Sequence, residues 1–323
     1  MNRAEAQDKP MQYSRLGRTG LKVSVAGLGC GGASRLGLSS NRSDAHAIKL
    51  IQTAMDRGVN LFDTSRQYQT HYVIKHALKD RPRENYILST KESSLYGGVP
   101  ITPTQLRAGI ETSLKELGTD YLDIFLLASL RIGDYLYARH ELVPVLERLR
   151  DEGKIRFFGL SEKFDADPTH RMLQRAMEDD CWDVILTGFN MINQTARDTI
   201  IQQAAAKDIG VMCMFAVRRA LRSRENIREV MFELAAKGLM PTDDLDINDP
   251  LGFLLENEGA QSLQDAAYRF CRHEPGIHTT LFGTGDLEHL HDNIDSLLRT
   301  GLRSQDLQRL KVMFAINRII TGQ

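Results

Sequence analysis

The sequence is short of cysteine and of net charge, and each shortage removes a class of function. Its four cysteines, among 323 residues, stand far apart and form no Cys-x-x-Cys pair, so neither a zinc cluster nor a redox dithiol can be read from them. Forty-one Lys and Arg residues against 42 Asp and Glu residues leave a net charge of -1, which provides no field to attract nucleic acid or an anionic membrane. We therefore expect reduced thiols and a small-molecule partner.

Long hydrophobic runs are also missing. No apolar stretch approaches the ~20 residues of a membrane helix, and the first nine residues mix charges without an apolar segment. These absences predict a cytoplasmic protein with a short flexible leader over 1–10. The remaining chain, at 42% hydrophobic residues overall, has ample material for a core. Its length admits two domains, but we expect 11–323 to form a single one.

The chain does show a regular alternation of short apolar runs and longer amphipathic stretches, which is typical of parallel βα units. The predicted strands are Val25–Cys30, Asn60–Thr64, Tyr86–Thr90, Leu122–Leu127, Ile155–Leu160, Val184–Phe189, Gly210–Phe215 and Thr279–Phe282. The clearest helices between them are Ser43–Arg57, Thr102–Leu117, His140–Glu152, Gln194–Lys207, Arg224–Lys237 and Ser262–His273. Eight strands that alternate with helices predict a parallel (β/α)8 TIM barrel.

One helix is specified by its boundary residues. Thr102 followed by Pro103 is typical of an N-cap with proline at the first helical position, and Gln105 completes a capping box with Thr102. Gly118 has the position of a C-cap. These residues predict a helix that begins after Thr102 and ends at Leu117.

An open, doubly wound sheet is the structural alternative to the barrel. Such a sheet carries G-x-G-x-x-G after its first strand, and Gly27, Gly29 and Gly32 stand at that spacing. The acidic residue expected about twenty positions later is displaced to Asp63, so the match is weak and we favour the barrel.

Two segments fall outside the repeat. Residues 11–24, with Gly17 and Gly20, predict a hairpin that would close the N-terminal mouth of the barrel. Residues 239–260 form a long insertion before the eighth strand, either a substrate loop over the active face or a solvated connector.

Two neighbouring predicted strands end in groups that suit proton transfer. The second strand ends at Asp63, with Tyr68 shortly beyond, and the third is followed by Lys91. Catalytic groups in such a barrel come from the C-terminal ends of strands, so we expect these three side chains to meet. A nearby ammonium favours a phenolate, which would let Tyr68 exchange a proton near neutral pH while Asp63 holds Lys91. Alternatively, Asp63 and Lys91 form an ordinary ion pair and Tyr68 is a packing residue.

Four strings carry a resemblance to a known family: Phe62-Asp-Thr-Ser-Arg-Gln-Tyr68, Leu88-Ser-Thr-Lys91, Ser113-Leu-Lys-Glu-Leu-Gly-Thr-Asp-Tyr-Leu-Asp-Ile124 and Gly153-Lys-Ile-Arg-Phe-Phe-Gly-Leu-Ser161. In this order they resemble the aldo-keto reductases over about 11–298. The resemblance implies a barrel that binds NADP(H), or less often NAD(H), and moves hydride between nicotinamide and a carbonyl or alcohol carbon. It makes Tyr68 the general acid for reduction and the base for oxidation, tuned by Asp63 and Lys91.

One position departs from the family pattern. The family usually has a catalytic histidine after its fourth strand, and here Ala128 stands at that place. Alanine cannot donate a hydrogen bond to a substrate oxygen, and the loss of one such donor costs on the order of 10² to 10³ in rate in other systems. We therefore expect a retained enzyme. Ser129 and Arg131 are either substrate-pocket residues near Ala128 or plain loop residues.

The resemblance also implies a set of cofactor-binding positions. Ser161 matches the serine that binds the carboxamide, whereas Glu162 and Leu186 replace its usual asparagine and glutamine companions. Phe215 stands where an aromatic ring stacks on the nicotinamide, and either following arginine could bind phosphate. The full expected set is Gly29, Cys30, Gly31, Asp63, Ser161, Glu162, Leu186, Phe215, Ala216, Arg218, Arg219, Gly283, Thr284, Gly285, His289, Asp292 and Asn293.

The segment from Phe282 to Asn293 is the best-matched part of that set. It resembles the loop and short helix that receive the adenosine phosphate. His289 and Gly283 stand where NADP-preferring members often carry arginine and lysine. We nevertheless expect NADP(H) ahead of NAD(H).

The remaining histidines show no metal-ligand spacing, and we expect most of them on helix surfaces or loops and no bound metal. Two functions stay open: an oxidoreductase for an aldehyde, ketone or sugar, and a weak or inactive nucleotide-binding barrel that senses the redox state of the cofactor. A Schiff-base lyase using Lys91 is chemically possible but would leave the cofactor segment unexplained. The sequence leaves the oligomeric state open.

Overall fold

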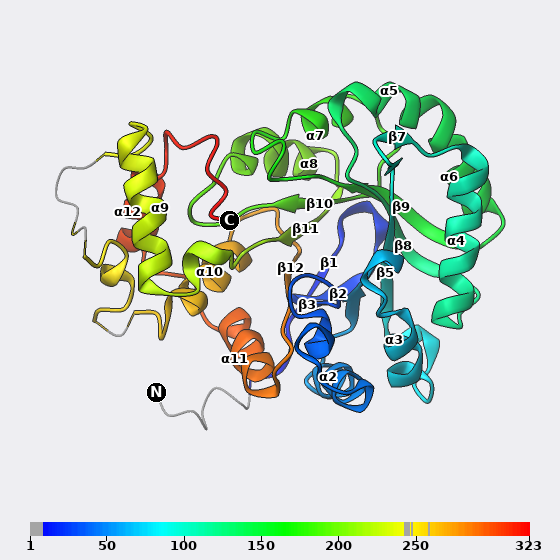
Figure 1. The fold of residues 1–323 in the computed structure, drawn as a ribbon, viewed down its shortest axis with the longest axis horizontal. Helices are drawn as coiled ribbons and strands as arrows, with labels where there is room; N and C mark the ends of the chain where they lie inside the picture. Colours follow the sequence, from blue (N-terminus) through cyan, green and yellow to red (C-terminus); the bar gives the residue numbers. More distant parts are fainter. Residues whose placement is uncertain (1–8, 242–245, 247, 258) are drawn as a thin grey trace.

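The computed structural model describes residues 9–241, 246, 248–257 and 259–323, and its centre is a closed barrel of parallel strands (Figure 1). In chain order the strands are β3 (Ala26–Gly29), β4 (Leu61–Asp63), β5 (Ile87–Ser93), β8 (Leu122–Ala128), β9 (Ile155–Ser161), β10 (Val184–Gly188), β11 (Gly210–Met214) and β12 (Thr279–Phe282). Because β12 pairs with β3 and closes the ring, the predicted barrel is confirmed and the open sheet is excluded.

The observed strand ends differ from the predicted ones by one residue in most cases. The largest difference is at β5, which runs on to Ser93 because its pairing with β8 continues as far as Ala128. Continuous apolar sequence is therefore a dependable strand signal in this chain, since each barrel strand is buried on both faces.

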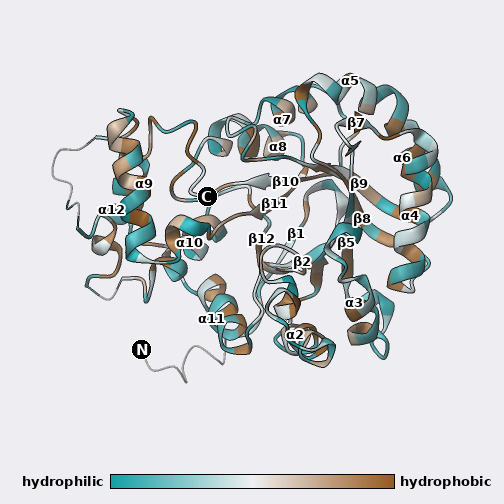
Figure 2. Cartoon of the chain, in the orientation of Figure 1, coloured by the Kyte–Doolittle hydropathy of each residue, from teal (hydrophilic) through white to brown (hydrophobic). Residues whose placement is uncertain are grey.

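Helices surround the barrel and show both apolar and polar faces (Figure 2). They are α2 (Asp44–Asp56), α3 (His71–Leu78), α4 (Pro103–Leu117), α5 (Tyr135–Tyr137), α6 (Val143–Asp151), α7 (Arg171–Ala176), α8 (Gln202–Ala206), α9 (Arg224–Ala236), α10 (Leu263–Arg272), α11 (Leu287–Leu298) and α12 (Ser304–Met313). The capping box of α4 is confirmed: the Gln105 N–H donates to the Thr102 hydroxyl at 3.2 Å, and Thr102 N–H to the Gln105 side chain at 2.8 Å. Gly118 ends the helix at φ 66°.

Two helices that we predicted as continuous are irregular. A π-helical turn, η6 (Ala138–Leu142), precedes α6, and another, η7 (Arg197–Ile201), precedes α8. Pro144 lies in the first turn of α6 and has no N–H to donate, so the regular hydrogen-bond ladder begins anew there. The structure offers no comparable reason at η7.

The predicted N-terminal hairpin is present as β1 (Tyr13–Arg15) paired antiparallel with β2 (Lys22–Ser24). Leu16, Leu21 and Val23 of this hairpin are buried against the inward-facing side chains of the barrel. The hairpin therefore closes the N-terminal mouth, as expected, and leaves the C-terminal mouth for a ligand.

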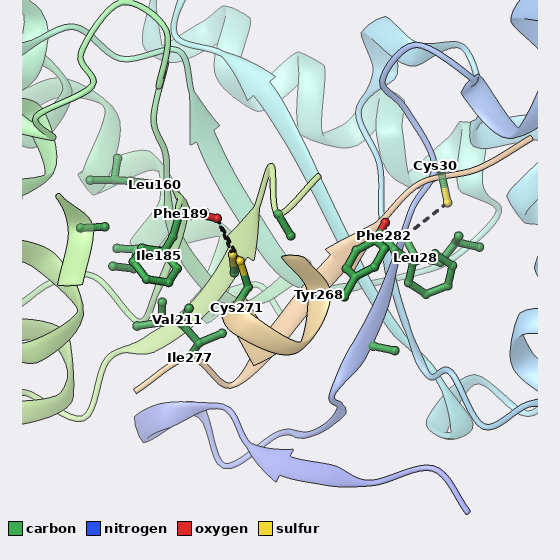
Figure 3. Close-up of a cluster of buried hydrophobic side chains, with 14 of the residues drawn as sticks. Leu28, Cys30, Leu160, Ile185, Phe189, Val211, Tyr268, Cys271, Ile277 and Phe282 are labelled. Carbon is green, nitrogen blue, oxygen red and sulfur yellow. Dashed lines mark hydrogen bonds between the residues drawn. The ribbon is translucent and has the colours of Figure 1, made fainter. Parts of the chain in front are cut away.

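The layer between strands and helices forms a second, larger core (Figure 3). In it, Cys271 of α10 lies near Phe189, which follows β10. The thiols of Cys213 and Cys271 both donate to the Phe189 carbonyl, at 3.5 and 3.3 Å. All four cysteines are free thiols, and burial beside Cys213 raises the pKa of Cys271.

The insertion at 239–260 is described except for residues 242–245, 247 and 258. Its described part contains η9 (Gly252–Leu254); Leu254 of this turn and Leu251, which precedes it, are buried in the outer core. Arg303 donates to the Phe253 carbonyl at 2.9 Å, which ties the insertion to α12. Residues 1–8 of the predicted leader lie outside the part of the chain that the structure describes. The domain boundary at residue 11 stays a prediction. Within the described chain, no helix is long and apolar enough to cross a membrane.

Candidate active site

The polar residues expected at the strand ends line the inside of the C-terminal mouth. Leu61, Ile87 and Leu126 of β4, β5 and β8 belong to the inner core. Side chains at even spacing along a strand share a face, so later residues of the same strands also face inward. At the mouth these are Asp63, Lys91 and Ala128.

Asp63 and Lys91 form a buried ion pair. Lys91 Nζ lies 2.5 Å from Asp63 Oδ2 and donates to the Thr64 carbonyl at 3.1 Å, while the Ser89 hydroxyl donates to Asp63 Oδ1 at 3.0 Å. Burial alone would lower the pKa of Lys91, but the carboxylate of Asp63 and the phenol of Tyr68 outweigh burial and raise it. Lys91 is therefore held as an ammonium.

Tyr68 is positioned above this pair by a short 3-10 turn, η3, over residues 66–68. Its N–H donates to the Ser65 carbonyl at 2.9 Å, and its carbonyl accepts from Arg35 Nε at 2.7 Å. The Ser65 hydroxyl in turn donates to the Lys91 carbonyl at 3.1 Å, which links the turn to β5. The Lys91 ammonium lies 5.3 Å from the centre of the half-buried Tyr68 ring. The expected trio is thus brought together.

The end of β3 makes room for the tyrosine. A Cβ atom on Gly31 would lie 2.3 Å from two carbons of the Tyr68 ring, so only glycine allows this close approach. Cys30 donates its N–H to the Asp63 carbonyl at 2.8 Å, and burial together with the Asp63 charge raises the pKa of its thiol. Gly29 pairs with Asp63 in the barrel register.

Ala128 ends β8 between two serines. Its Cα pairs with Ser93 on β5 and with Ser161 on β9, so a methyl group stands where three adjacent strands reach the mouth. Ser129 follows with φ 60°, an uncommon conformation for a residue other than glycine, and its N–H donates to the Ser161 carbonyl at 3.0 Å. Such outliers are frequent at functional sites.

Beside Ala128 lies a pocket of about 300 Å³. It contains two of the three expected substrate-pocket residues, Ser129 and Arg131. Arg131 is exposed and is steadied by Asp134, whose carboxylate lies 2.6 Å from Nε. The complete lining is Ser93, Leu95, Gly98, Ser129, Arg131 and Lys163.

The positions expected to bind the carboxamide are all buried. Ser161 ends β9 on its inner face, and Leu186 belongs to the inner core. Glu162 is also buried, and its carboxylate accepts from the Thr187 hydroxyl at 2.8 Å and the Gly188 N–H at 2.6 Å. Its second oxygen lies 2.8 Å from His170 Nδ1. The Glu162 carboxylate is therefore engaged within the protein.

The loop after β11 presents an aromatic ring and a buried guanidinium. Phe215 has φ 66°, is 39% exposed, and stacks on Phe164 with a centroid distance of 6.2 Å. Arg218 lies over the Phe215 ring and contacts both Asp165 oxygens at 2.7 and 2.9 Å. Burial would raise the pKa of Asp165, but hydrogen bonds from Arg218 and Thr321 outweigh it and lower the pKa. Nε and Nη1 of Arg218 are buried without a hydrogen-bond partner.

The rest of this loop is held by the C-terminal segment. Ala220 N–H donates to the Gly322 carbonyl at 2.9 Å, within a 3-10 turn, η8, over residues 219–221. Arg219 is exposed and paired with Glu229 at 2.7 Å, and Ala216 is buried.

The loop after β12 leads into α11, whose N-terminus is capped. Asp286 accepts from the N–H groups of Glu288 and His289 at 2.8 and 3.1 Å, and these bonds, that from His289 first, lower the pKa of its carboxyl. The Gly285 carbonyl lies 2.8 Å from His46 Nε2. Of the other expected residues here, Gly283, His289 and Asp292 are exposed, Asn293 is half-buried and Thr284 is buried.

The model of the aldo/keto reductase family matches residues 28–313. This span contains the barrel strands β4 to β12 in full and the second half of β3. The chain belongs to the aldo/keto reductase family. Members of this family are oxidoreductases that generally depend on NAD(P)H. The activity of this particular aldo-keto reductase is taken up below as a proposal.

Individual relatives of this aldo-keto reductase are distant. Aldo-keto reductase YhdN of Bacillus subtilis is 26% identical over 313 residues, 87% of this chain and 88% of its own length. L-galactose dehydrogenase of Arabidopsis thaliana is 34% identical over 157 residues, and the match spans about half of each protein, 47% and 48%. An aldo-keto reductase from Bacillus halodurans, in its holo form, superposes with a TM-score of 0.71 at 21% identity over 93% of this chain and 96% of that one, which shows the shared fold.

Several site residues of this aldo-keto reductase had not been predicted. Ser89, Ser65 and Arg35 hold the trio through hydrogen bonds, but a serine or arginine near a strand end carries no distinctive pattern. Two histidines, His71 and His170, are buried, away from the helix surfaces and loops expected for most of them. His71 lies between Glu116 and Thr90, and burial lowers its pKa. Within the described residues, no group of potential ligands could hold a metal ion.

Proposed function

We propose that this aldo-keto reductase interconverts the carbonyl and alcohol forms of an aldehyde, ketone or sugar with a nicotinamide cofactor, and that Tyr68 is its general acid and base. The observation that carries the proposal is the buried Asp63–Lys91 pair beside the Tyr68 ring. The other hydrogen bonds of the two side chains go to the Ser89 hydroxyl and the Thr64 carbonyl, both at the same mouth. An ion pair with a purely structural role has no need of a half-exposed phenol beside it.

The mouth has features that fit NADP(H), with NAD(H) as the second choice. The exposed Phe215 ring offers a face for a nicotinamide, and Ser161 offers a hydroxyl for its carboxamide. Arg218 holds two buried donor nitrogens without partners, and a phosphate oxygen would satisfy them. When bound, the cofactor would supply or accept the hydride. It remains a prediction that the cofactor contacts Glu162, Leu186 and the α11 residues.

The protein's own contribution to the reaction is the transfer of a proton. A lysine ammonium has three donors, and two of those on Lys91 are used by Asp63 and Thr64. The third is free to approach the Tyr68 hydroxyl and stabilise its phenolate. In reduction the Tyr68 O–H bond breaks, the proton passes to the carbonyl oxygen, and the phenolate is protonated again from water at the mouth. Oxidation runs the same transfer backwards.

The decisive variant is Tyr68→Phe. We expect kcat for aldehyde reduction to fall by at least about 10²-fold, the range of a lost general acid, with cofactor affinity unchanged by cofactor fluorescence. Tyr72→Phe removes a hydroxyl from an exposed tyrosine on α3 and serves as the matched control. Comparing NADPH with NADH in the same binding assay decides the cofactor preference. Undiminished turnover by Tyr68→Phe would show that Tyr68 is not the acid.

Ala128 favours a second candidate, a nucleotide-binding barrel with little turnover that senses the redox state of the cofactor. A methyl group at the mouth cannot polarise a carbonyl, so one electrostatic contribution to catalysis is missing. Tight cofactor binding without turnover on a broad panel of aldehydes, ketones and aldoses, in both directions, would identify this function. The lyase alternative is disfavoured, because the raised pKa of Lys91 keeps it protonated and non-nucleophilic.

A further inference from the structure

The pocket beside Ala128 is polar and positively charged. Of its six lining residues, two are cationic, two carry hydroxyl groups, and none is acidic. Arg131 is paired with Asp134, but no ion pair of Lys163 is found among the described residues. The pocket therefore keeps a positive charge that the protein leaves uncompensated.

One lining residue of this pocket, Ser93, follows Lys91 of the proposed reaction centre on the same strand. Ser93 faces the same side of β5 as Lys91, two residues or about 6.6 Å further along the strand. Across the register Ser93 pairs with Ala128, and Ser129 follows Ala128 with its uncommon positive φ. A substrate whose carbonyl lies near Tyr68 would thus reach the pocket with a second group, separated from that carbonyl by about the length of one benzene ring.

The lining is arranged to hold a small anion. Arg131 Nη2 also donates to the Gly98 carbonyl at 3.2 Å, so its guanidinium is anchored at the rim by two contacts. A guanidinium, an ammonium and serine hydroxyls that line one pocket are groups that match the oxygens of a carboxylate or phosphate. An aliphatic or aromatic substrate end would find only Leu95 as an apolar contact.

We propose that Arg131, Lys163 and Ser129 form a subsite for an anionic oxyacid group, carboxylate or phosphate, on the carbonyl substrate. The inference rests on the proposed function and narrows its substrate class. In this protein the missing histidine at Ala128 would leave room for the substrate to extend sideways into the subsite. The subsite affects substrate binding and leaves the proton transfer to Tyr68.

The test compares two aldehydes of equal shape, 4-formylbenzoate and 4-formylbenzamide, with the intact enzyme and NADPH. We expect kcat/KM to be at least about tenfold higher for the benzoate, because two cationic side chains line the subsite. Lys163→Gln should remove up to about fivefold of this preference through KM, since a single exposed charge contact contributes at most about 1 kcal/mol. Arg131→Gln should act likewise, and the benzamide should change less than about twofold. Lys115→Gln, at the exposed C-terminal end of α4, is the matched charge control. Glyceraldehyde 3-phosphate against glyceraldehyde distinguishes phosphate from carboxylate.

The two proposals fail in different ways. The subsite would be refuted, and the oxidoreductase left intact, by either of two results. One is an equal kcat/KM for the benzoate and the benzamide, and the other is an equal loss of kcat/KM for both aldehydes in Lys163→Gln. If no aldehyde were reduced, the proposed function would fail, and calorimetry would then judge the subsite alone. There, 4-(hydroxymethyl)benzoate should bind more tightly than 4-(hydroxymethyl)benzamide and lose up to about fivefold in affinity in Lys163→Gln. Equal binding of both compounds would refute it.

Discussion

Gly31→Ala tests whether the exact position of Tyr68 limits the reaction. The added Cβ would lie 2.3 Å from two ring carbons, whereas ordinary contacts begin at 3.4 Å, so the ring must move by about 1.1 Å. The Tyr68 backbone is held by Ser65 and Arg35, at 2.9 and 2.7 Å, so the displacement falls on the side chain and moves the hydroxyl from its present position. A misplacement of about 1 Å can cost 10²-fold in rate.

We accordingly expect Gly31→Ala to lower kcat by about 10²-fold in initial-rate assays of NADPH oxidation with an aldehyde. Gly133→Ala is the control, because a Cβ there meets nothing within 4 Å. In a Tyr68→Phe background the same Gly31 substitution should have little further effect, since both changes act on one hydroxyl. A kcat within twofold of the parent, or full additivity with Tyr68→Phe, would refute the reasoning.

Three further predictions concern rate and stability. Ala128→His should raise kcat for carbonyl reduction by about tenfold or more, and an unchanged kcat would show that this donor is not limiting. Thr102→Ala should cost about 1 kcal/mol in urea unfolding, whereas Thr102→Ser should not. Burial lowers the pKa of His278 below its ordinary 6.5, so the unfolded chain binds more protons and the unfolding free energy should fall as the pH drops through about 6.5. His278→Asn should flatten that dependence between pH 7 and pH 5.5, and an unaltered slope would contradict it.

The barrel could be predicted because its signals are local. An apolar run such as Leu122–Leu127 predicts a strand buried on both faces wherever it stands in the chain. The capping residues Thr102 and Gln105 specify the start of α4 within four residues of sequence. Asp63 and Lys91 could be paired in advance because parallel strands end at the same side of a barrel.

Side-chain networks between distant segments could not be predicted in this way. Glu162 stood at an expected cofactor position, and only the structure shows that its carboxylate is engaged by Thr187, Gly188 and His170. The bond from Thr321 to Asp165 joins residues 156 positions apart. No periodicity relates such residues, since their contact depends on how whole elements pack.

The amino-acid sequence by itself determined the order of strands and helices and the presence of Asp63, Tyr68 and Lys91 near strand ends, because hydrophobic periodicity and capping act over a few residues. Tertiary structure alone decided that the Tyr68 ring packs closely against Gly31 and that Arg218 is buried with two donor nitrogens that have no hydrogen-bond partner. It also decided that a cationic pocket lies beside Ala128. Distances of this kind depend on barrel closure and on loops that meet across it, and neither is encoded in any single stretch of chain.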